Sequence, residues 1–442
     1  MVAAESPHSV SSVPAVAAVT CAGVIAALAF AFLARESIGD GADLGEFLVV
    51  AGIVLALQIA IAGSFLQKGW QMPVMIVVGF AAVFRVIGVI GAPILEDDHF
   101  RFMWDGRSSV EIGSPYGHAP LDSFDAELGE FDDVLDGINH PDIPTVYGPS
   151  SQWTFALAYL IAPAETWPLQ LLSALADLAI VMLLVRVASP MAVFLYAWSP
   201  LPIKEFAFTA HPDAIGALLL FVAFLAFKSR REWPVGIAVA LALGVKPFAL
   251  VLAPYLLGLS VRAWLAFVVT AIVIAAPFGF LDAWVPEGLA AMASVWLFNA
   301  PLYYLALFAG GPIAVQLLKG ILLLAYSAWW ASRFMPWIWA WLRRKVVGIE
   351  TVPAAMSVGL FLAILPVLNP WYLVWWLPFA AIGPLRFTPW VVAAVVLASY
   401  VTGINLSSET LALYEQPTWV LVAEAALIIA ALAFDIRSIR RR

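Results

Sequence analysis

Runs of about 20 consecutive apolar residues recur along the chain, and no other feature limits its possible folds so strongly. A run of this length is what an α-helix needs to cross about 30 Å of hydrocarbon. Of the 442 residues, 63% are hydrophobic and only 12% are charged, whereas soluble domains carry about a quarter charged residues. The runs are continuous rather than alternating, which excludes a transmembrane β-barrel. The sequence therefore predicts an all-α, polytopic transmembrane helical bundle.

The apolar runs number twelve, and one further apolar stretch is ambiguous. Residues 234–258 are interrupted by Lys246 and Pro247. They form either one kinked span or a helical hairpin that returns to its starting side. We therefore expect about 12–13 spans, with a large outer loop after the third span. The twelve runs cover residues 15–34, 46–66, 73–92, 168–187, 190–208, 212–228, 261–279, 312–333, 352–366, 370–383, 388–404 and 417–436.

Basic residues indicate which ends of the spans face the cytoplasm, because Lys and Arg are enriched on that side. They cluster at 228–231, 343–345 and 437–442. Loops with basic residues alternate along the chain with acidic or neutral loops. If 234–258 is a hairpin, which is the interpretation we favour, this alternation puts both termini in the cytoplasm. The prediction is a multi-pass protein of the plasma (inner) membrane with three parts, namely a disordered cytoplasmic N-terminus (1–14), a single transmembrane domain (15–436) and a basic cytoplasmic tail (437–442).

The largest hydrophilic segment, residues 93–150, falls on the outer side in this topology. It holds 13 of the 30 acidic residues of the chain and only two basic ones, Arg101 and Arg107. Ionisable groups are therefore concentrated at one face of the membrane. Such a concentration is typical of a functional site rather than of a solubilising surface, and we expect 93–150 to be the outer catalytic loop.

The stretch LEDDHFRFMWDGR, residues 95–107, places three carboxylates side by side at the membrane surface. Like charges repel one another strongly where water is scarce. Asp97 or Asp98 could deprotonate an acceptor hydroxyl as a general base, with Glu96 contacting the substrate. The same two aspartates could instead bind a divalent cation such as Mg²⁺ or Mn²⁺. Aromatic residues alternate with charges here, which favours a helix lying at the interface.

Later residues of this loop have a structural and a functional interpretation. Asp105 and Arg107 either form an internal ion pair that orders the loop or contact the substrate directly. The Pro- and Gly-rich segment 138–150 predicts an ordered loop without regular structure. His140 and Tyr147 would then form part of a pocket wall.

Further ionisable residues lie within or beside the apolar runs, where a charge is a functional hypothesis by default. Lys204 is a candidate for substrate binding, although it could form a purely structural pair with the adjacent Glu205. His211 could donate a hydrogen bond to a phosphate. Asp213 begins the next run, where a carboxylate also serves as a helix cap.

Lys246 lies in the middle of an apolar stretch and is followed at once by Pro247. A lysine at this depth is costly unless it reaches a water-filled cavity or an anion, or snorkels to the surface. A lysine directed at a lipid-linked phosphate would explain both the charge and the break. Asn369 and Trp371 belong to the aromatic cluster LNPWYLVWWLPF, which is either an interfacial belt or a surface for sugar rings and isoprenoid chains.

Six motifs occur in a fixed order between about residue 90 and 380: EDDHFRFMWDGR, SPYGHAP, INHPDIPTVYGP, KEFAFTAHPD, VKP and NPWY. This ordered set resembles bacterial GT-C membrane glycosyltransferases, closest to glycosyltransferase family 87 and the polyprenol-phosphate-mannose-dependent α-mannosyltransferases. The resemblance implies a GT-C-type bundle that takes a sugar from a polyprenyl-phosphate carrier at the outer face. It also implies inversion at the transferred carbon and a base that is either Asp97 or Asp98.

The chemistry of such a transfer agrees with the residues. The carrier phosphate gains negative charge as it leaves, and cations such as Lys246, Arg101 or His211 would stabilise it. Inversion by one displacement needs a single base, unlike the two-carboxylate scheme of glycosidases. We therefore expect a hexosyltransferase, with mannose as the first candidate sugar. Its partners would be the lipid-linked donor, a lipid or glycan acceptor and the bilayer, with no nucleic acid.

Two other classes of membrane protein remain as alternatives. A polytopic transporter or lipid-carrier flippase would use the same charged residues as substrate or proton sites. Transport predicts polar residues in both halves of the bilayer, whereas here they collect at one face. An acyl or phosphoethanolamine transferase predicts a Ser-His-Asp pattern or a dense His/Asp metal cluster, and the sequence has neither.

Overall fold

The computed structural model describes residues 12–39, 41–123, 129–288, 296–343 and 352–440. Within these residues every regular element is a helix, apart from one isolated bridge between Phe298 and Val367. The predicted all-α class is confirmed. The helices of the first half are α1 (Val13–Ile38), α2 (Leu44–Lys68), α3 (Val74–Ile90), α4 (Asp98–Glu111), η1 (Pro120–Asp122), α5 (Phe131–Asp136), α6 (Pro149–Ile161), α7 (Trp167–Val187), α8 (Pro190–Ala197), α9 (Pro200–Pro202) and η2 (Ile203–Phe208).

The second half of the chain alternates long helices with short, broken ones. Its described helices are α10 (Asp213–Lys228), α11 (Glu232–Leu243), η3 (Pro247–Val251), α12 (Ala253–Leu257), α13 (Val261–Ala275), η4 (Ala276–Phe278), α14 (Phe280–Trp284), α16 (Pro301–Leu342), α17 (Ala354–Ala363), η6 (Pro370–Trp375), α18 (Leu377–Ala381), α19 (Thr388–Val395), η7 (Val396–Tyr400) and α20 (Thr418–Arg440).

Six helices in the described part of the chain are long and apolar enough to cross a membrane. They are α1, α2, α7, α13 with η4, α16 and α20, and a seventh span results if the bent pair around Thr209 counts as one. A multi-pass membrane protein is therefore supported, with fewer continuous spans than the twelve or thirteen predicted. The interval 352–383 explains part of the difference, because Pro366, Pro370 and Pro378 interrupt its apolar sequence and a proline inside a helix removes a hydrogen bond.

The predicted ends of the transmembrane domain differ slightly from the observed helices. Helix α1 begins at Val13, two residues before the predicted start of the domain, and α20 continues to Arg440 within the predicted tail. The remainder of the predicted N-terminal segment, residues 1–11, lies outside the described residues.

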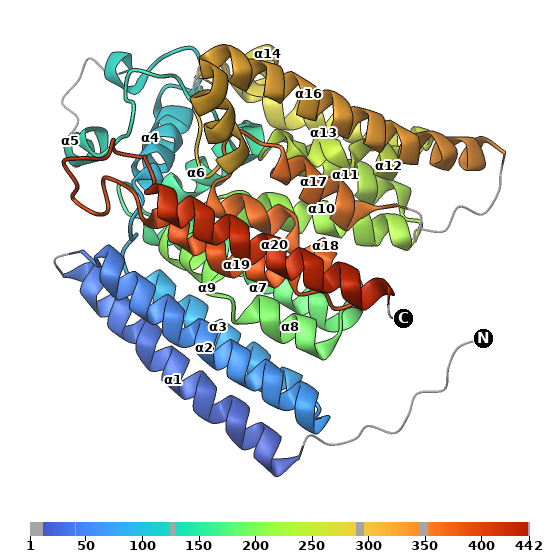
Figure 1. Ribbon diagram of the computed structural model, residues 1–442. Helices are drawn as coiled ribbons and strands as arrows, with labels where there is room; N and C mark the ends of the chain where they lie inside the picture. Colours follow the sequence, from blue (N-terminus) through green and yellow to red (C-terminus); the bar gives the residue numbers. More distant parts are fainter. Residues whose placement is uncertain (1–11, 40, 124–128, 289–295, 344–351, 441–442) are drawn as a thin grey trace.

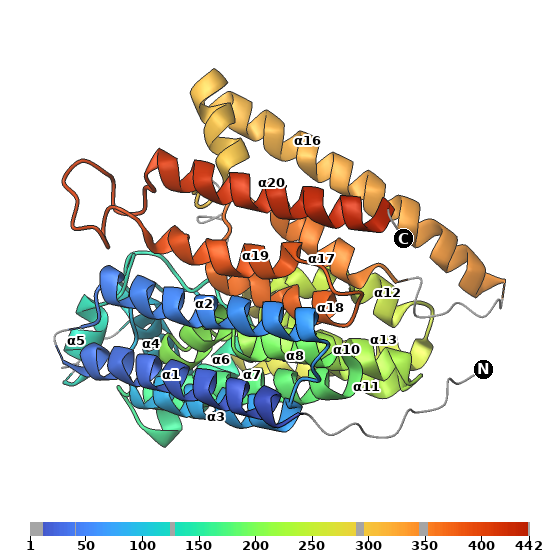
Figure 2. The same ribbon diagram turned by 60° about the horizontal axis from the view of Figure 1, so that its bottom comes forward.

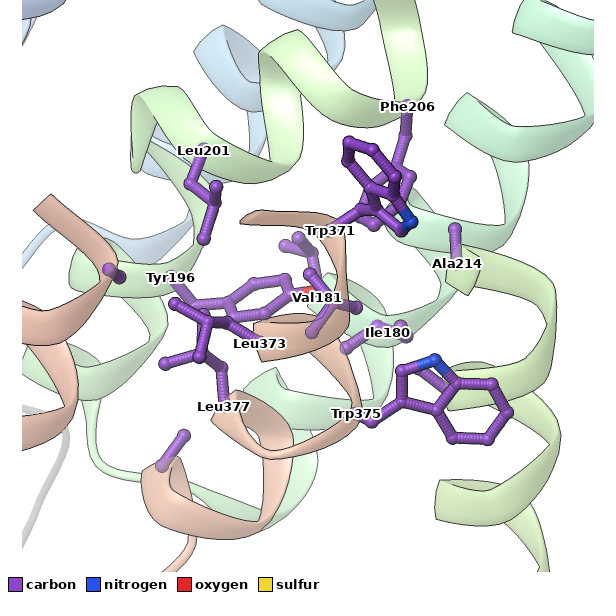
Figure 3. Packing of buried hydrophobic residues seen from close by; sticks show 14 of the residues in the cluster. Ile180, Val181, Tyr196, Leu201, Phe206, Ala214, Trp371, Leu373, Trp375 and Leu377 are labelled. Carbon is purple, nitrogen blue, oxygen red and sulfur yellow. The ribbon is translucent and has the colours of Figure 1, made fainter. Parts of the chain in front are cut away.

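A large hydrophobic core joins helices that are far apart in the sequence. Figure 3 shows Ile180 and Tyr196, from α7 and α8, packed near Leu373 and Trp375 of η6. A buried ion pair connects two helices of this core: Arg85 on α3 donates two hydrogen bonds to Asp177 on α7. Helix α16 lies along the outside of the bundle (Figures 1 and 2) and leaves most of its apolar surface exposed, as expected for a helix that faces lipid.

The two ends of the bundle differ in what they carry. Helices α4 and α5 lie at one end, whereas the start of α1 and the end of α20 lie at the other (Figures 1 and 2). Arg386 belongs to the second end, because it donates a hydrogen bond to Ser438 near the end of α20. Lys228 also lies away from the acidic loop, at the far end of α10. Lys228, Arg386 and the two described ends of the chain thus share one end of the molecule.

The ambiguous stretch 234–258 breaks after α11. Helix α12 packs back against α11 and α10, as the hairpin interpretation predicts. At the break, the Gly244 carbonyl accepts a hydrogen bond from the Ser150 backbone at the start of α6. A Cβ atom on Gly148 would lie 2.5 Å from that carbonyl oxygen, so only glycine allows the two segments to approach this closely. This contact fixes the position of Lys246, two residues further on.

Candidate active site

The acidic cluster lies where the chain leaves α3 and begins α4. Leu95 adopts a left-handed backbone conformation, with φ 60°, which is a strained conformation for a residue with a branched side chain. Asp97 is the N-cap residue of α4 and Asp98 its first residue. The positive end of the helix dipole favours negative charge at both positions. Local structure thus compensates part of the repulsion within the cluster.

Each carboxylate of the cluster has a different partner. Asn139 donates a hydrogen bond to Asp97 over 3.4 Å, and Tyr147 donates one to Asp98 over 3.4 Å. His211 Nε2 lies 3.6 Å from Asp98 Oδ2. The adjacent Glu96 carboxylate lies 3.6 Å from Lys204 Nζ, a group that is almost completely buried. The three carboxylates therefore point to three different surroundings.

The bent pair η2 and α10 supplies the cations behind these carboxylates. The two helical segments meet at an angle of 117°, and η2 is a π-helical turn, a form that occurs frequently at functional sites. Ala210, in the bend, has a left-handed φ of 63°. The next residue, His211, is buried and stacks on the Trp371 ring at a centroid distance of 3.8 Å. The bend thus turns Lys204 and His211 toward the acidic cluster.

Lys246 is held by the first residue of α10. Its Nζ lies 2.6 Å from Asp213 Oδ2 and 4.6 Å from the centre of the Tyr372 ring. Trp375 donates a hydrogen bond of 2.7 Å to the other oxygen of Asp213. Gly216 makes this geometry possible, because a Cβ atom there would lie 2.2 Å from the Trp375 ring. An ion pair and an aromatic platform together orient the lysine.

A cavity of about 120 Å³ brings the charged and aromatic groups together. Seven of the predicted site residues line it: Glu96, Asp97, Asp98, Tyr147, Lys246, Asn369 and Trp371. The other lining residues are Leu95, Asn139, Val146, Trp296, Phe298, Tyr372, Ser399, Tyr400, Thr402, Ile404, Asn405 and Tyr414. Segments from the two halves of the chain therefore enclose one site at the end of the bundle that carries α4.

The three carboxyl groups of the acidic cluster differ in pKa because their surroundings differ. Burial and the neighbouring charge of Asp98 raise the pKa of Asp97 to about 6. Burial raises the pKa of Glu96 to about 7, against the lowering effect of Lys204. Burial alone would also raise the pKa of Asp98, but the close contact with His211 and the charge of Lys246 hold it below its usual value. The surroundings of Asp98 therefore favour its ionised form, whereas Glu96 and Asp97 both exchange a proton nearer to neutral pH.

The other predicted site residues fall into two groups. Lys204, His211 and Asp213 do not line the cavity but lie buried against residues that do. Arg101, Asp105, Arg107 and His140 do not line it either.

Two of the four remote residues join in an internal network. Arg101 pairs with Asp105 at 2.9 Å and donates to the Ile143 carbonyl. Asp105 also accepts hydrogen bonds from Thr145 and Gln152. This network ties α4 to the loop before α6. Asp105 thus orders the loop through an ion pair with Arg101, whereas the sequence had suggested Arg107 as its partner.

Arg107 belongs to a separate contact on α4. It pairs with Glu111 at 2.9 Å and lies over the Phe131 ring. His140 has a left-handed φ of 59° in the loop after α5. Neither residue reaches the cavity.

The acidic cluster is also the predicted place for a metal ion. In the part of the chain that the structure describes, no group of three or more His, Cys, Asp and Glu side chains is arranged to hold one. Asp97 and Asp98 are the two oxygen donors that the sequence suggested, and they contact Asn139 and His211 respectively. A divalent cation at this site stays a prediction.

The sequence did not single out the wall formed by residues 399–414. Ser399, Tyr400, Thr402 and Tyr414 are common residue types at the ends of apolar runs and carry no charge pattern. The first three lie near the end of the eleventh predicted run and Tyr414 follows that run, and this position on the outer side was the one available signal. No family model, no curated protein and no solved structure matches this chain.

Proposed function

We propose that this chain is a membrane glycosyltransferase of GT-C type that moves a hexose from a polyprenyl-phosphate carrier to an acceptor hydroxyl. The observation that carries the proposal is the cavity itself, which has Asp97 and Lys246 in one lining. A carboxylate with a pKa of about 6 is a suitable base. A lysine fixed at the site is a suitable partner for a phosphate leaving group.

Asp97 is the better base of the two aspartates. Asp98 is engaged by His211 and Tyr147 and has a lowered pKa, so it has little tendency to accept a proton. Asp97 has a raised pKa and one hydrogen bond from a neutral amide. General-base catalysis is most effective when the pKa of the base lies near the working pH. The proposed role of Asp98 is to hold His211 in place.

The reaction is a single displacement at the anomeric carbon of the sugar. Asp97 takes the proton of the acceptor hydroxyl while that oxygen forms a bond to C1. The bond from C1 to the carrier phosphate oxygen breaks, and its electron pair leaves with the phosphate. Lys246 stabilises the charge that develops on the phosphate, and His211 adds positive charge behind Asp98. Attack from the face opposite the leaving group inverts the configuration at C1.

The arrangement of the bundle supports a site at the outer face of the plasma membrane. Lys228, Arg386 and the described ends of the chain lie at the end of the molecule away from the acidic loop. The positive-inside rule would then put both termini in the cytoplasm. The short apolar helices α3, α11, α17 and α19 would complete further spans in pairs or with broken neighbours, toward the 12–13 first expected.

The experiment is sugar transfer by the purified protein in detergent, with a panel of polyprenyl-phosphate hexoses that begins with mannose. We expect turnover with at least one donor and a loss of at least 100-fold in kcat for Asp97→Asn. Asp122→Asn, in the exposed part of the same loop, is the matched control and should retain wild-type turnover. Full activity of Asp97→Asn would overturn the assignment of the base.

The same preparation tests the transport alternative. Wild-type protein in liposomes that takes up solute or moves a lipid carrier, without transferring sugar from any donor, would replace the proposed enzyme by a transporter. Donor turnover without uptake supports the enzyme.

A further inference from the structure

One wall of the cavity comes from the end of η7 and the segment that follows it before α20. This wall, residues 399–414, contributes Ser399, Tyr400, Thr402, Asn405 and Tyr414 to the lining. None of these side chains is ionised near neutral pH. The charged lining residues come instead from the acidic cluster and from Lys246. The cavity thus has a charged part, which suits the proposed chemical step, and an uncharged part, residues 399–414, which is called the neutral wall below.

Two hydroxyl groups in the neutral wall have no partner. Ser399 and Thr402 are buried, with 0% and 3% of their surface exposed. Neither side-chain oxygen has a hydrogen-bond partner in the protein. Buried hydroxyls are nearly always bonded, because leaving one unsatisfied is costly. On the wall of a cavity, such groups point to a ligand that supplies the missing hydrogen bonds.

The other groups of the wall suit the same ligand. Asn405 donates a hydrogen bond to the Tyr400 carbonyl, which fixes its amide beside the cavity. Tyr414 packs edge-on against Trp296 at 5.8 Å, and both line the cavity. Aromatic surfaces receive the apolar C–H faces of a sugar ring, while hydroxyls and amides bond to its edge. A pyranose ring presents both kinds of surface.

We propose that Ser399 and Thr402 bind ring hydroxyls of the transferred hexose, so that this wall selects the sugar. The inference rests on the proposed function, because the ring it concerns is the one whose C1 lies between Asp97 and Lys246. A hydroxyl side chain can donate and accept, and it therefore distinguishes epimers that present an oxygen in one of two directions. The neutral wall selects the sugar, and the acidic cluster and Lys246 carry out the chemical step.

The test compares pairs of polyprenyl-phosphate hexoses that differ at one ring hydroxyl, such as mannose and glucose or glucose and galactose. Ser399→Ala and Thr402→Val each remove a hydroxyl with little change in volume. We expect the ratio of kcat/KM for the two donors to fall about 3- to 10-fold in at least one variant, which is the effect of one neutral hydrogen bond. Turnover of the preferred donor should fall by a similar factor and not be abolished, because neither residue takes part in proton transfer.

Ser357→Ala is the matched control. The Ser357 side-chain oxygen is likewise buried without a partner, but it lies in α17 and does not line the cavity. Its donor ratio should equal that of the wild type. An unchanged ratio in both test variants, or the same change in the control, would overturn the inference.

Direct binding separates this inference from the proposed function. Short-chain citronellyl-phosphate hexoses are titrated into wild-type protein and the two variants, and the dissociation constants of the epimers are compared. If no donor is turned over, the proposed transferase fails, yet epimer discrimination that is lost in Ser399→Ala or Thr402→Val still supports a sugar-selecting wall. Equal binding of all epimers by the wild type contradicts it, whatever the transfer assay shows.

Discussion

Lys246 and Asp213 are 33 positions apart in the sequence, and their charged groups meet at 2.6 Å. Each follows a break in the chain, one at the end of α11 and one in the bend before α10. The Asp213 side chain is fully buried, whereas the lysine keeps 14% of its side chain exposed. The pair therefore presents the cation to the cavity and keeps its counter-charge behind it.

The first prediction separates the structural role of this pair from its proposed role in sugar transfer. Lys246→Met leaves the Asp213 carboxylate buried without its partner, which costs about 3–5 kcal/mol. We expect a clear fall in the Tm of the protein in detergent and a loss of sugar transfer. The double variant Lys246→Met/Asp213→Asn removes both charges and should recover most of the Tm but none of the transfer. Recovery of both properties would show that Lys246 has a structural role only.

The second prediction concerns pH. A base must be deprotonated to act, and the pKa of Asp97 is raised to about 6. The pH profile of kcat/KM should therefore fall below pH 6, to about one tenth of its plateau at pH 5. Asn139 stabilises the ionised form of Asp97 through its hydrogen bond, so Asn139→Ala should move the fall to higher pH.

Glu96 provides the control for that profile, because its pKa is also raised, to about 7. Glu96→Gln should leave the fall near pH 6 in place. A fall that disappears in this variant would assign it to Glu96 instead of Asp97.

The charged residues of the site could be predicted from the sequence because charged residues are rare within an apolar chain. Lys246 and Asp98 were selected on that ground, and the structure places both at one cavity. The residues of the neutral wall could not be predicted in this way. Ser399 and Thr402 are ordinary in an apolar run, and their missing partners become visible only once the chain is folded.

The sequence predicted the class of fold better than it predicted the number of spanning helices or the contacts of individual side chains. Apolar composition predicted the helical class, but it overestimated how many runs form continuous helices of spanning length. Arg101 was expected to stabilise the carrier phosphate, and Asp105 was expected either to contact the substrate or to pair with Arg107. Helix geometry instead pairs them with each other at positions i and i+4.

The third prediction concerns the buried pair that links α3 to α7. Arg85 donates to Asp177 at 2.9 and 2.6 Å and to the Ala197 carbonyl at 2.6 Å, and both charged side chains are almost completely buried. Arg85→Met leaves an unpaired buried carboxylate and should destabilise the protein by about 3–5 kcal/mol. The measurement is thermal unfolding in detergent.

A surface pair gives the comparison for Arg85. Arg262 lies 3.3 Å from Glu232, with 70% and 41% of the two side chains exposed. Such pairs contribute about 0–1 kcal/mol, so Arg262→Met should leave the Tm nearly unchanged. Equal losses in the two variants would show that burial of the Arg85 pair is not what makes it important.

The fourth prediction concerns Gly216, where α10 passes beneath Trp375. A Cβ atom at this position would lie 2.2 Å from the indole ring, so Gly216→Ala forces the ring or the helix to move. Overpacking of this kind costs about 1–3 kcal/mol. It also displaces the indole that donates to Asp213, so sugar transfer should fall together with the Tm.

Gly79→Ala, in the middle of α3, is the matched control because a Cβ atom there meets nothing within 4 Å. Alanine is favoured over glycine within a helix by about 1 kcal/mol, so this variant should be as stable as the wild type or more stable, with unchanged transfer. If Gly216→Ala behaves in the same way, the close approach of Trp375 to α10 does not hold Asp213 and Lys246 in position. A fall in transfer confined to Gly216→Ala would mean that packing beneath the cavity determines where the cation lies.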